Sequence, residues 1–177
     1  MREAGVLMPV SALPSRVGAG ELGESAFHFI ELLKKNHVKI WQIRPLNPVG
    51  YGNSPYQPYS SCAGDEIYIS LDKLAEDGLL KTAPEAFLQN AKRVDYEAVR
   101  QYREPFLREA FEVFTKKKGQ EEPAYKEFVA QEWVYEYGVF RALKKANNGN
   151  CWNDWAKEDR NWPENRHALS AEVEAEA

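Results

Sequence analysis

The sequence is poor in the residues that bind metal ions or cross-link small domains. It contains only two cysteines and three histidines among 177 residues. Cys62 and Cys151 stand far apart, and the histidines are scattered, so neither a metal-ligand spacing nor a disulfide framework can be recognised. We therefore expect no metal site.

Long apolar runs are also missing, and so is an excess of positive charge. Pro9 and Pro14 interrupt the apolar residues near the N-terminus, unlike a signal peptide, and no run approaches the roughly 20 apolar residues of a membrane helix. The net charge of −4 and the isoelectric point near 5.5 argue against a general nucleic-acid-binding protein, which needs a basic face. We expect a cytoplasmic protein whose partners are neither nucleic acids nor membranes.

The composition is otherwise that of a globular protein with one core of ordinary size. Hydrophobic residues make up 44% of the chain and charged residues 28%, which excludes a disordered chain. Five Trp, nine Tyr and eight Phe make it rather aromatic. Aromatic side chains suit contacts with carbohydrates or proteins, but they suit an ordinary core equally well.

The first 45 residues predict a strand, a helix and a second strand. Short apolar runs at 6–8 and 40–43 suit buried strands, and the apolar face of residues 24–36 suits a helix between them. This order implies parallel strands with a right-handed crossover, and in such sheets the loops after the strands contain the functional residues.

The loop after the second predicted strand is rich in glycine, proline and tyrosine. Proline at 45 and 48 ends the strand, and three tyrosines follow among residues that allow close approach of a ligand to the backbone: Tyr51, Tyr56 and Tyr59 among Gly50, Gly52, Asn53 and Pro55. The residue types alone leave two interpretations open. The loop either forms the wall of a binding site or covers the core with its tyrosines.

The loop after the first predicted strand matches a dinucleotide-binding pattern by its letters. Gly18, Gly20 and Gly23 have the G-x-G-x-x-G spacing and precede a helix. In that motif, however, the first glycine directly follows the strand, and an acidic residue stands about 20 residues further on. Neither condition holds here. The glycines are better explained as turn residues, and no dinucleotide cofactor is expected.

The rest of the chain is expected to be mainly helical. An alternating pattern at 67–71 predicts a third extended segment, and the helices are expected at 74–80, 83–92, 96–117 and 125–145. Two aromatic stripes favour buried helix faces: Phe106, Leu107, Ala110, Phe111 and Phe114, then Phe128, Trp133, Tyr137, Phe140 and Leu143. A polar break at 147–150 precedes Trp152, Trp155 and Trp162, for which a cluster that caps the helices is favoured, and the acidic tail from Leu169 is a short helix or a frayed end.

Several blocks, in order, resemble one enzyme family. They are Ala4–Leu7 with Ser11–Ser15, Gly18–Gly23, Trp41-Gln42 with Pro45-Leu46, Tyr51–Gln57 (YGNSPYQ), and Ala63–Asp65 with Ile69–Leu74 and Gly78–Leu80. Together they are similar to the start of the 4-alpha-glucanotransferases, the amylomaltase or disproportionating-enzyme family of glycoside hydrolases. The similarity is strong to about Leu80, looser beyond it, and covers about the first third of the family's usual span.

The resemblance implies an α/β fold, the N-terminal part of a (β/α)8 TIM-type barrel with a mainly helical inserted subdomain. Residues 1–80 would form the first βα units with glucan-binding loops, and residues 81–177 the helical insertion. A complete barrel takes about 250 residues, so this chain is not expected to close one alone.

The resemblance also implies a retaining transfer of α-1,4-glucan segments between maltooligosaccharides, which needs neither cofactor nor metal. Such chemistry uses two carboxyl groups about 5 to 5.5 Å apart. In the family these stand on later barrel strands, so no catalytic residue is expected in this segment, and the chain alone is expected to be inactive. Nothing pairs the acids nearest the loops for acid/base work: Glu21, Glu24, Asp65 and Glu66.

Substrate binding is the role that the resemblance leaves to this segment. It assigns Ser54 and Tyr56 to donor-side glucan subsites, Tyr51 to a second glucan-binding groove, and Tyr96 to that groove by a looser alignment. Three residues depart from the family pattern: Arg44, Asn47, and Asp65, which stands where the family tends to have Asn. Two alternatives stay open, a non-catalytic alpha-glucan-binding module and a helical domain that forms oligomers.

Overall fold

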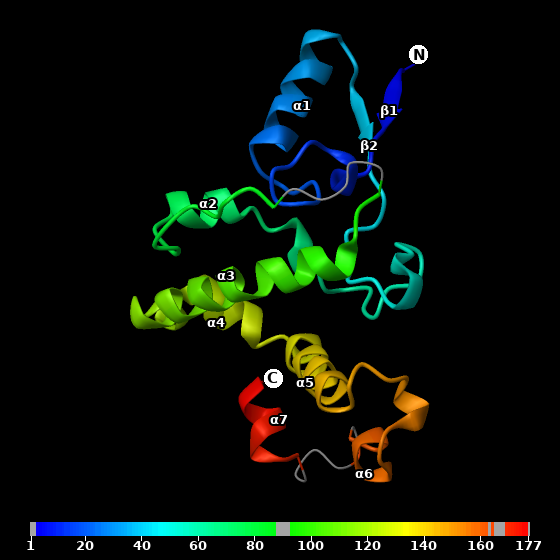
Figure 1. Cartoon of the computed structure of the whole chain (residues 1–177), viewed down its shortest axis with the longest axis vertical. Helices are drawn as coiled ribbons and strands as arrows, with labels where there is room; N and C mark the ends of the chain where they lie inside the picture. The colour runs from blue at the N-terminus through cyan, green and yellow to red at the C-terminus, as the bar shows by residue number, and fades with distance from the viewer. Residues whose placement is uncertain (1–2, 88–92, 163, 165–168, 177) are drawn as a thin grey trace. The chain divides into compact units, whose positions relative to one another are not determined.

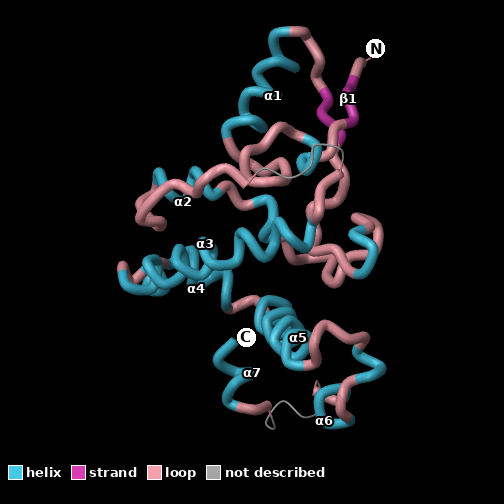
Figure 2. Tube along the Cα trace, in the orientation of Figure 1, coloured by secondary structure: helices cyan, strands magenta, loops and turns pink. Residues whose placement is uncertain are grey.

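The computed structural model describes residues 3–87, 93–162, 164 and 169–176 (Figure 1). The chain forms two compact units, Met1–Gln120 and Glu121–Ala177. Among the described residues, helices predominate, and a small parallel sheet is the sheet structure present (Figure 2). The expected mixture of a parallel sheet with a helix-rich second half is confirmed. Within the same residues, no helix combines the length and the apolar character needed to cross a membrane.

The sheet pairs the two strands that the sequence predicts. Strand β1 (Gly5–Leu7) lies parallel to β2 (Ile40–Gln42), with Gly5 opposite Ile40 and Leu7 opposite Gln42. A Cβ atom at Gly5 would lie only 3.0 Å from the Cβ of Ile40, so a larger residue there would require Ile40 to shift slightly. The predicted strand-helix-strand unit is therefore correct.

Helix α1 (Glu24–Lys35) connects the strands and packs against β2. Its first turn contains Glu24, and its last contains Lys34 and Lys35, charges that suit the helix dipole. The rings of Phe29 and Trp41 meet edge to face at 5.1 Å. The Trp41 indole also donates a hydrogen bond to the Met8 carbonyl (2.8 Å), which ties β2 to the chain just after β1.

Three predictions for residues 65–92 need correction, and capping side chains explain the first two. Residues Glu66–Tyr68 form a short 3₁₀ helix, not a strand, since the Asp65 carboxylate accepts a hydrogen bond from the Ile67 N–H. Ser70 in turn caps helix α2 (Leu71–Glu76), which begins and ends earlier than the predicted 74–80. The helix predicted at 83–92 is absent from 83–87, and residues 88–92 lie outside the described residues.

Helix α3 (Tyr96–Lys116) is the long helix of the first unit and matches the prediction. Asp95 caps it by accepting a hydrogen bond from the Ala98 N–H (3.1 Å). Its buried residues are Val99, Arg103 and Ala110. The predicted stripe is wrong at Phe111, which is 55% exposed, because the buried spacing runs through positions 99, 103, 106 and 110 and leaves 111 beside it.

The core of the first unit joins α3 to segments from the first 80 residues. Val99 packs with Ala19 and Ile67, and Ala110 packs with Val17 and Leu71. By packing, the unit boundary therefore falls after Gln120, whereas the family resemblance divides the chain after residue 80. The assignment of 1–80 to barrel units and 81–177 to an inserted subdomain stays a prediction.

The second unit contains the remaining described helices, α4 (Pro123–Val129), α5 (Glu132–Ala146), α6 (Lys157–Arg160) and α7 (Ala171–Glu176). The single helix predicted at 125–145 is thus two helices. Gln131 is extended, its carbonyl accepts the Val134 N–H, and its side chain accepts the Trp133 indole N–H, which starts a new helix. Phe128, 49% exposed, does not join the predicted buried face.

The core of the second unit forms where α5 meets the tryptophan-rich segment and α7. Its buried residues are Val139, Ala142, Leu143, Trp155, Trp162 and Val173. Trp155 and Trp162 are thus core residues, whereas Trp152 is 57% exposed. The polar break after α5 contains Asn148 and Gly149 at positive φ, as its composition predicts.

Candidate functional site

The loops that follow β1 and β2 lie at the carboxyl ends of parallel strands. Residues 8–23 follow β1, and residues 43–65 follow β2. In sheets of this kind, ligands bind at that edge. The candidate site therefore lies where these two loops meet α3 in the first unit.

The second of these loops is closed at its base into a hairpin-like shape, and we call residues 46–65 the tyrosine loop. Its two sides are joined by Asp65 N to Leu46 O (2.8 Å), Asn47 Nδ2 to Ala63 O (3.0 Å), Tyr59 N to Pro48 O (2.9 Å) and Gly50 N to Gln57 O (3.4 Å). An antiparallel bridge between Val49 and Pro58 adds to them. Asn47, one of the departures from the family pattern, thus helps to close the loop.

The tip of the tyrosine loop turns through residues in the left-handed region. Gly52 (φ 80°) and Asn53 (φ 53°) have positive φ, a conformation that glycine and asparagine adopt most readily. The Ser54 carbonyl then accepts a hydrogen bond from the Gln57 N–H (3.1 Å). Glycine and asparagine therefore stand at the two positions of the tip where the backbone needs a positive φ.

The structure describes the side chains of three of the four predicted binding residues. Ser54 is half-buried at the tip of the tyrosine loop, and Tyr56 is 72% exposed. Tyr96 is half-buried as the first residue of α3. Tyr51 lies in the short 3₁₀ helix Tyr51–Asn53, and its side chain is outside the described part of the chain.

A small hollow brings Tyr96 together with the tip of the tyrosine loop. Asn53 and Pro55 line it from the loop, and Tyr68, Tyr96 and Arg100 line it from the other side. Its volume of about 60 Å³ equals roughly two water molecules. The hollow is therefore too small to enclose a ligand as large as a sugar ring.

Two of the charged groups that line the hollow, Arg100 and Asp65, pair with each other. Arg100 donates to both carboxylate oxygens of Asp65 (2.8 and 2.6 Å) and lies 3.4 Å from Glu66. The Asp65 side chain is 2% exposed. Burial, and then the neighbouring Asp65 charge, raise the pKa of Tyr68, so this phenol stays neutral at ordinary pH.

A second buried ion pair joins the loop after β1 to α3. Arg103 donates to Glu21 (2.9 Å), and Ser70 donates to the other oxygen of the same carboxylate (2.8 Å). Three of the four acids that the sequence places near the loops are therefore engaged by arginines: Glu21, Asp65 and Glu66. This arrangement suits structural ion pairs and not general acid/base catalysis. Among the described residues, no three His, Cys, Asp or Glu side chains are grouped to hold a metal ion.

Sequence reasoning missed both arginines, although one of them left a signal. Arg103 occupies a place in the apolar spacing Val99, Arg103, Phe106, Ala110. A charged residue on a buried helix face needs a partner of opposite charge, so this pattern predicts a buried carboxylate nearby.

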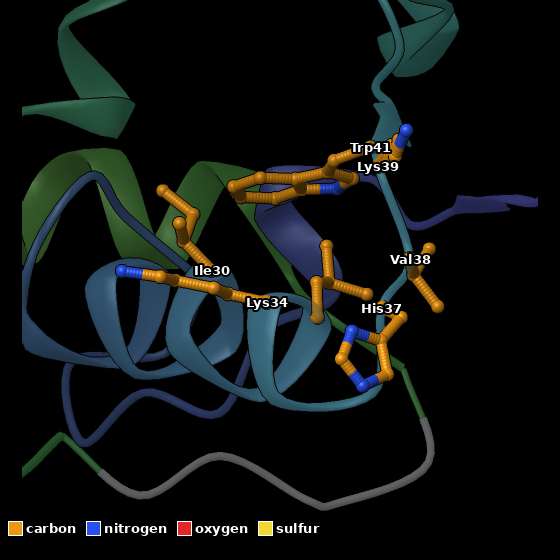
Figure 3. A pocket seen from close by; sticks show the side chains of 7 residues that line it. Ile30, Lys34, His37, Val38, Lys39 and Trp41 are labelled. Carbon is orange, nitrogen blue, oxygen red and sulfur yellow. The ribbon is translucent and has the colours of Figure 1, made fainter.

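A larger hollow of about 440 Å³ lies at the opposite end of the strands (Figure 3). The C-terminal half of α1 and the start of β2 line it. Figure 3 shows the Trp41 ring over the helix, with Ile30 and Lys34 below it and His37 at the helix end. No carboxylate lines this hollow, and it lies away from the loops, so it is not the candidate site.

Comparisons with known proteins identify the same family over most of the chain. A family model described as 4-alpha-glucanotransferase, glycoside hydrolase family 77, matches residues 8–177. A 4-alpha-glucanotransferase of Synechocystis sp. is 41% identical over 165 residues, covering 89% of this chain and 32% of the relative. That of Thermus thermophilus is 38% identical over 180 residues, covering 97% and 36%. The chain thus spans about a third of the length of these curated relatives.

A solved structure is similar over almost the whole chain. It is an amylomaltase from Streptococcus agalactiae in complex with acarbose, with a TM-score of 0.81 and 29% sequence identity. The match covers 98% of this chain and 37% of the amylomaltase chain.

Proposed function

The chain belongs to the 4-alpha-glucanotransferase family, glycoside hydrolase family 77, and from this premise we propose that it supplies part of the substrate-binding site of an enzyme that transfers α-1,4-glucan segments between maltooligosaccharides. The observation that supports the proposal most directly is the position of Tyr96 beside the tip of the tyrosine loop. One predicted glucan-binding residue, Tyr96, thus lines a hollow together with Asn53 and Pro55, the chain neighbours of the predicted residues Ser54 and Tyr56.

The proposed chemistry is a retaining transfer. A carboxylate attacks the anomeric carbon while a second carboxyl group protonates the departing oxygen, and an acceptor glucan then replaces the enzyme carboxylate. We place both carboxyl groups outside residues 1–177. Glu21 and Asp65 support this view because each is already engaged by an arginine.

Within this scheme the chain's own residues bind the sugar. Tyr56, 72% exposed, presents a ring that can stack on a sugar face, and Ser54 next to the same tip supplies a hydroxyl. We assign these two residues to the donor side. Tyr96 and Tyr51 belong to a second groove in this proposal.

The proposed architecture follows the family. Residues 1–80 would be the first βα units of a (β/α)8 barrel, and residues 81–177 a mainly helical inserted subdomain. The parallel pairing of β1 with β2 across α1 supports the first part of this proposal. A cytoplasmic location stays a prediction.

The test is a disproportionation assay with maltotriose. The complete protein, which we propose to extend beyond residues 1–177, is incubated with maltotriose, and the products are separated by chromatography. We expect glucose together with longer oligosaccharides, because a transferase passes the glucan segment to a second sugar and not to water. Residues 1–177 alone are expected to bind maltooligosaccharides without transfer.

Two other outcomes would replace the proposal. If the complete protein binds maltooligosaccharides but transfers none, the non-catalytic alpha-glucan-binding module is favoured. Neither binding nor transfer, together with a helical oligomer indifferent to sugar, favours the interaction domain.

A further inference from the structure

Two arginines of helix α3, one turn apart, form hydrogen-bonded ion pairs with the two loops of the candidate site. Arg100 pairs with Asp65 at the base of the tyrosine loop, and Arg103 pairs with Glu21 in the loop after β1. Residues three apart lie on nearly the same side of a helix. One face of α3 therefore holds two separate loops.

The pair with Asp65 lies at the point where the tyrosine loop closes. The Asp65 N–H donates to the Leu46 carbonyl (2.8 Å), which joins the two ends of the loop. One oxygen of its carboxylate also accepts the Ile67 N–H (3.0 Å). Arg100 therefore binds a residue whose backbone and side chain both determine the position of the loop.

Arg100 also has a fixed relation to Tyr96. The two residues stand four apart at the start of α3, so they lie on the same face of the helix, one turn apart. Both line the small hollow opposite Asn53 and Pro55. The Arg100–Asp65 pair thus connects the turn that contains Tyr96 to the loop that contains Ser54 and Tyr56.

We propose that Arg100 is a positioning residue for glucan binding, which holds the tyrosine loop at a fixed separation from Tyr96 through its two hydrogen bonds with Asp65. This inference rests on the proposed function. A guanidinium makes two parallel bonds to a carboxylate and fixes orientation as well as distance, whereas a lysine ammonium makes a single-point contact. The role therefore requires arginine and not only a positive charge.

The test compares three arginines of α3. Arg100→Gln removes the pair at the tyrosine loop, Arg103→Gln removes the pair with Glu21, in which the arginine is more deeply buried, and Arg108→Gln removes an exposed pair with Glu104. The KM and kcat for maltotriose are measured for each variant of the complete enzyme that the proposed function implies. Hydrogen exchange at the Tyr59 and Asp65 amides, which close the loop, is measured in parallel.

We expect Arg100→Gln to raise KM by about tenfold, with a smaller change in kcat, since displaced positioning groups can cost up to ~10²-fold. Exchange at Tyr59 and Asp65 should become faster in this variant alone. Arg100→Lys should recover part of the KM. Arg103→Gln should lower thermal stability but leave the KM of the folded fraction near that of the unaltered protein, as should Arg108→Gln.

Equal KM changes in the Arg100 and Arg103 variants, or unchanged loop exchange in Arg100→Gln, would overturn the positioning role. If the unaltered protein neither binds nor transfers glucan, the proposed function fails. The exchange measurement then still decides whether Arg100 orders the tyrosine loop, so the two failures can be told apart.

Discussion

Arg103 and Glu21, 82 residues apart in the sequence, form an ion pair in the interior of the first unit, with 2.9 Å between Nη1 and Oε2. The Arg103 side chain is 1% exposed and also donates to the Ile69 carbonyl. Ser70, which caps α2, donates to the same Glu21 carboxylate. One buried cation thus joins the loop after β1, the start of α2 and the middle of α3.

Replacing Arg103 by methionine should destabilise the protein by about 3–5 kcal/mol, because it leaves the Glu21 carboxylate buried without its cation. The double variant Glu21→Gln with Arg103→Met should recover much of this loss, because no charge is then buried. Urea unfolding followed by tryptophan fluorescence measures both. Arg108→Met, at a half-exposed pair, is the control and should change stability by less than about 1 kcal/mol. A double variant that recovers none of the stability lost in Arg103→Met would contradict the argument.

The parts of the fold that were predictable are those that hydrophobic spacing controls. The apolar runs at 6–8 and 40–43 gave the strands, and the periodicity of 96–117 gave α3 nearly to its ends. These patterns are local, and the core of the first unit selects the same conformations. The candidate site residues Ser54, Tyr56 and Tyr96 came from the family resemblance and stay predictions.

The parts that were not predictable depend on single polar side chains. Asp65 and Ser70 bond to nearby N–H groups and turn an alternating stretch into a 3₁₀ helix and a helix start. Gln131 and Trp133 break one expected helix into two. The pairing of Arg100 with Asp65 joins residues far apart in sequence, and no local pattern specifies which acid an arginine will find.

The corrected face of α3 predicts unequal effects for two of its phenylalanines. Phe106 packs with the core of the first unit, and Phe111 is 55% exposed. Phe106→Ala should therefore cost about 1.5–3 kcal/mol of unfolding free energy, whereas Phe111→Ala should stay within about 0.5 kcal/mol. Urea midpoints of the two variants measure the difference. Equal losses would mean that Phe111 is covered, as the original stripe predicted.

The half-buried phenol of Tyr68 predicts a loss of stability at alkaline pH. Its pKa is raised in the folded protein, chiefly by burial, so between the unfolded value of about 10 and the folded value the native state binds more protons than the unfolded one. Stability from this group is complete below pH ~10 and is lost as the pH rises through the folded pKa. The stability difference between the unaltered protein and Tyr68→Phe should thus be constant near neutral pH and shrink above pH ~10. A difference that grows with pH would contradict the assignment.

Tyr56 offers the sharpest test of the proposed sugar contact, because its ring is 72% exposed and contributes little to the core. Tyr56→Ala should raise the KM for maltotriose by about two- to tenfold, the range expected when about 0.5–1.5 kcal/mol of ring contact is lost. Tyr56→Phe keeps the ring and should retain most of the binding, which separates stacking from hydrogen bonding by the phenol. Tyr135→Ala, which removes a 47% exposed tyrosine from the second unit, is the matched control and should leave KM unchanged. Thermal unfolding should be nearly the same for the two Tyr56 variants and the unaltered protein, whereas Tyr135→Ala also removes an edge-to-face contact with Trp162. A KM change limited to Tyr56→Ala would locate glucan at the tip of the tyrosine loop. Unchanged kinetics in that variant would remove Tyr56 from the site.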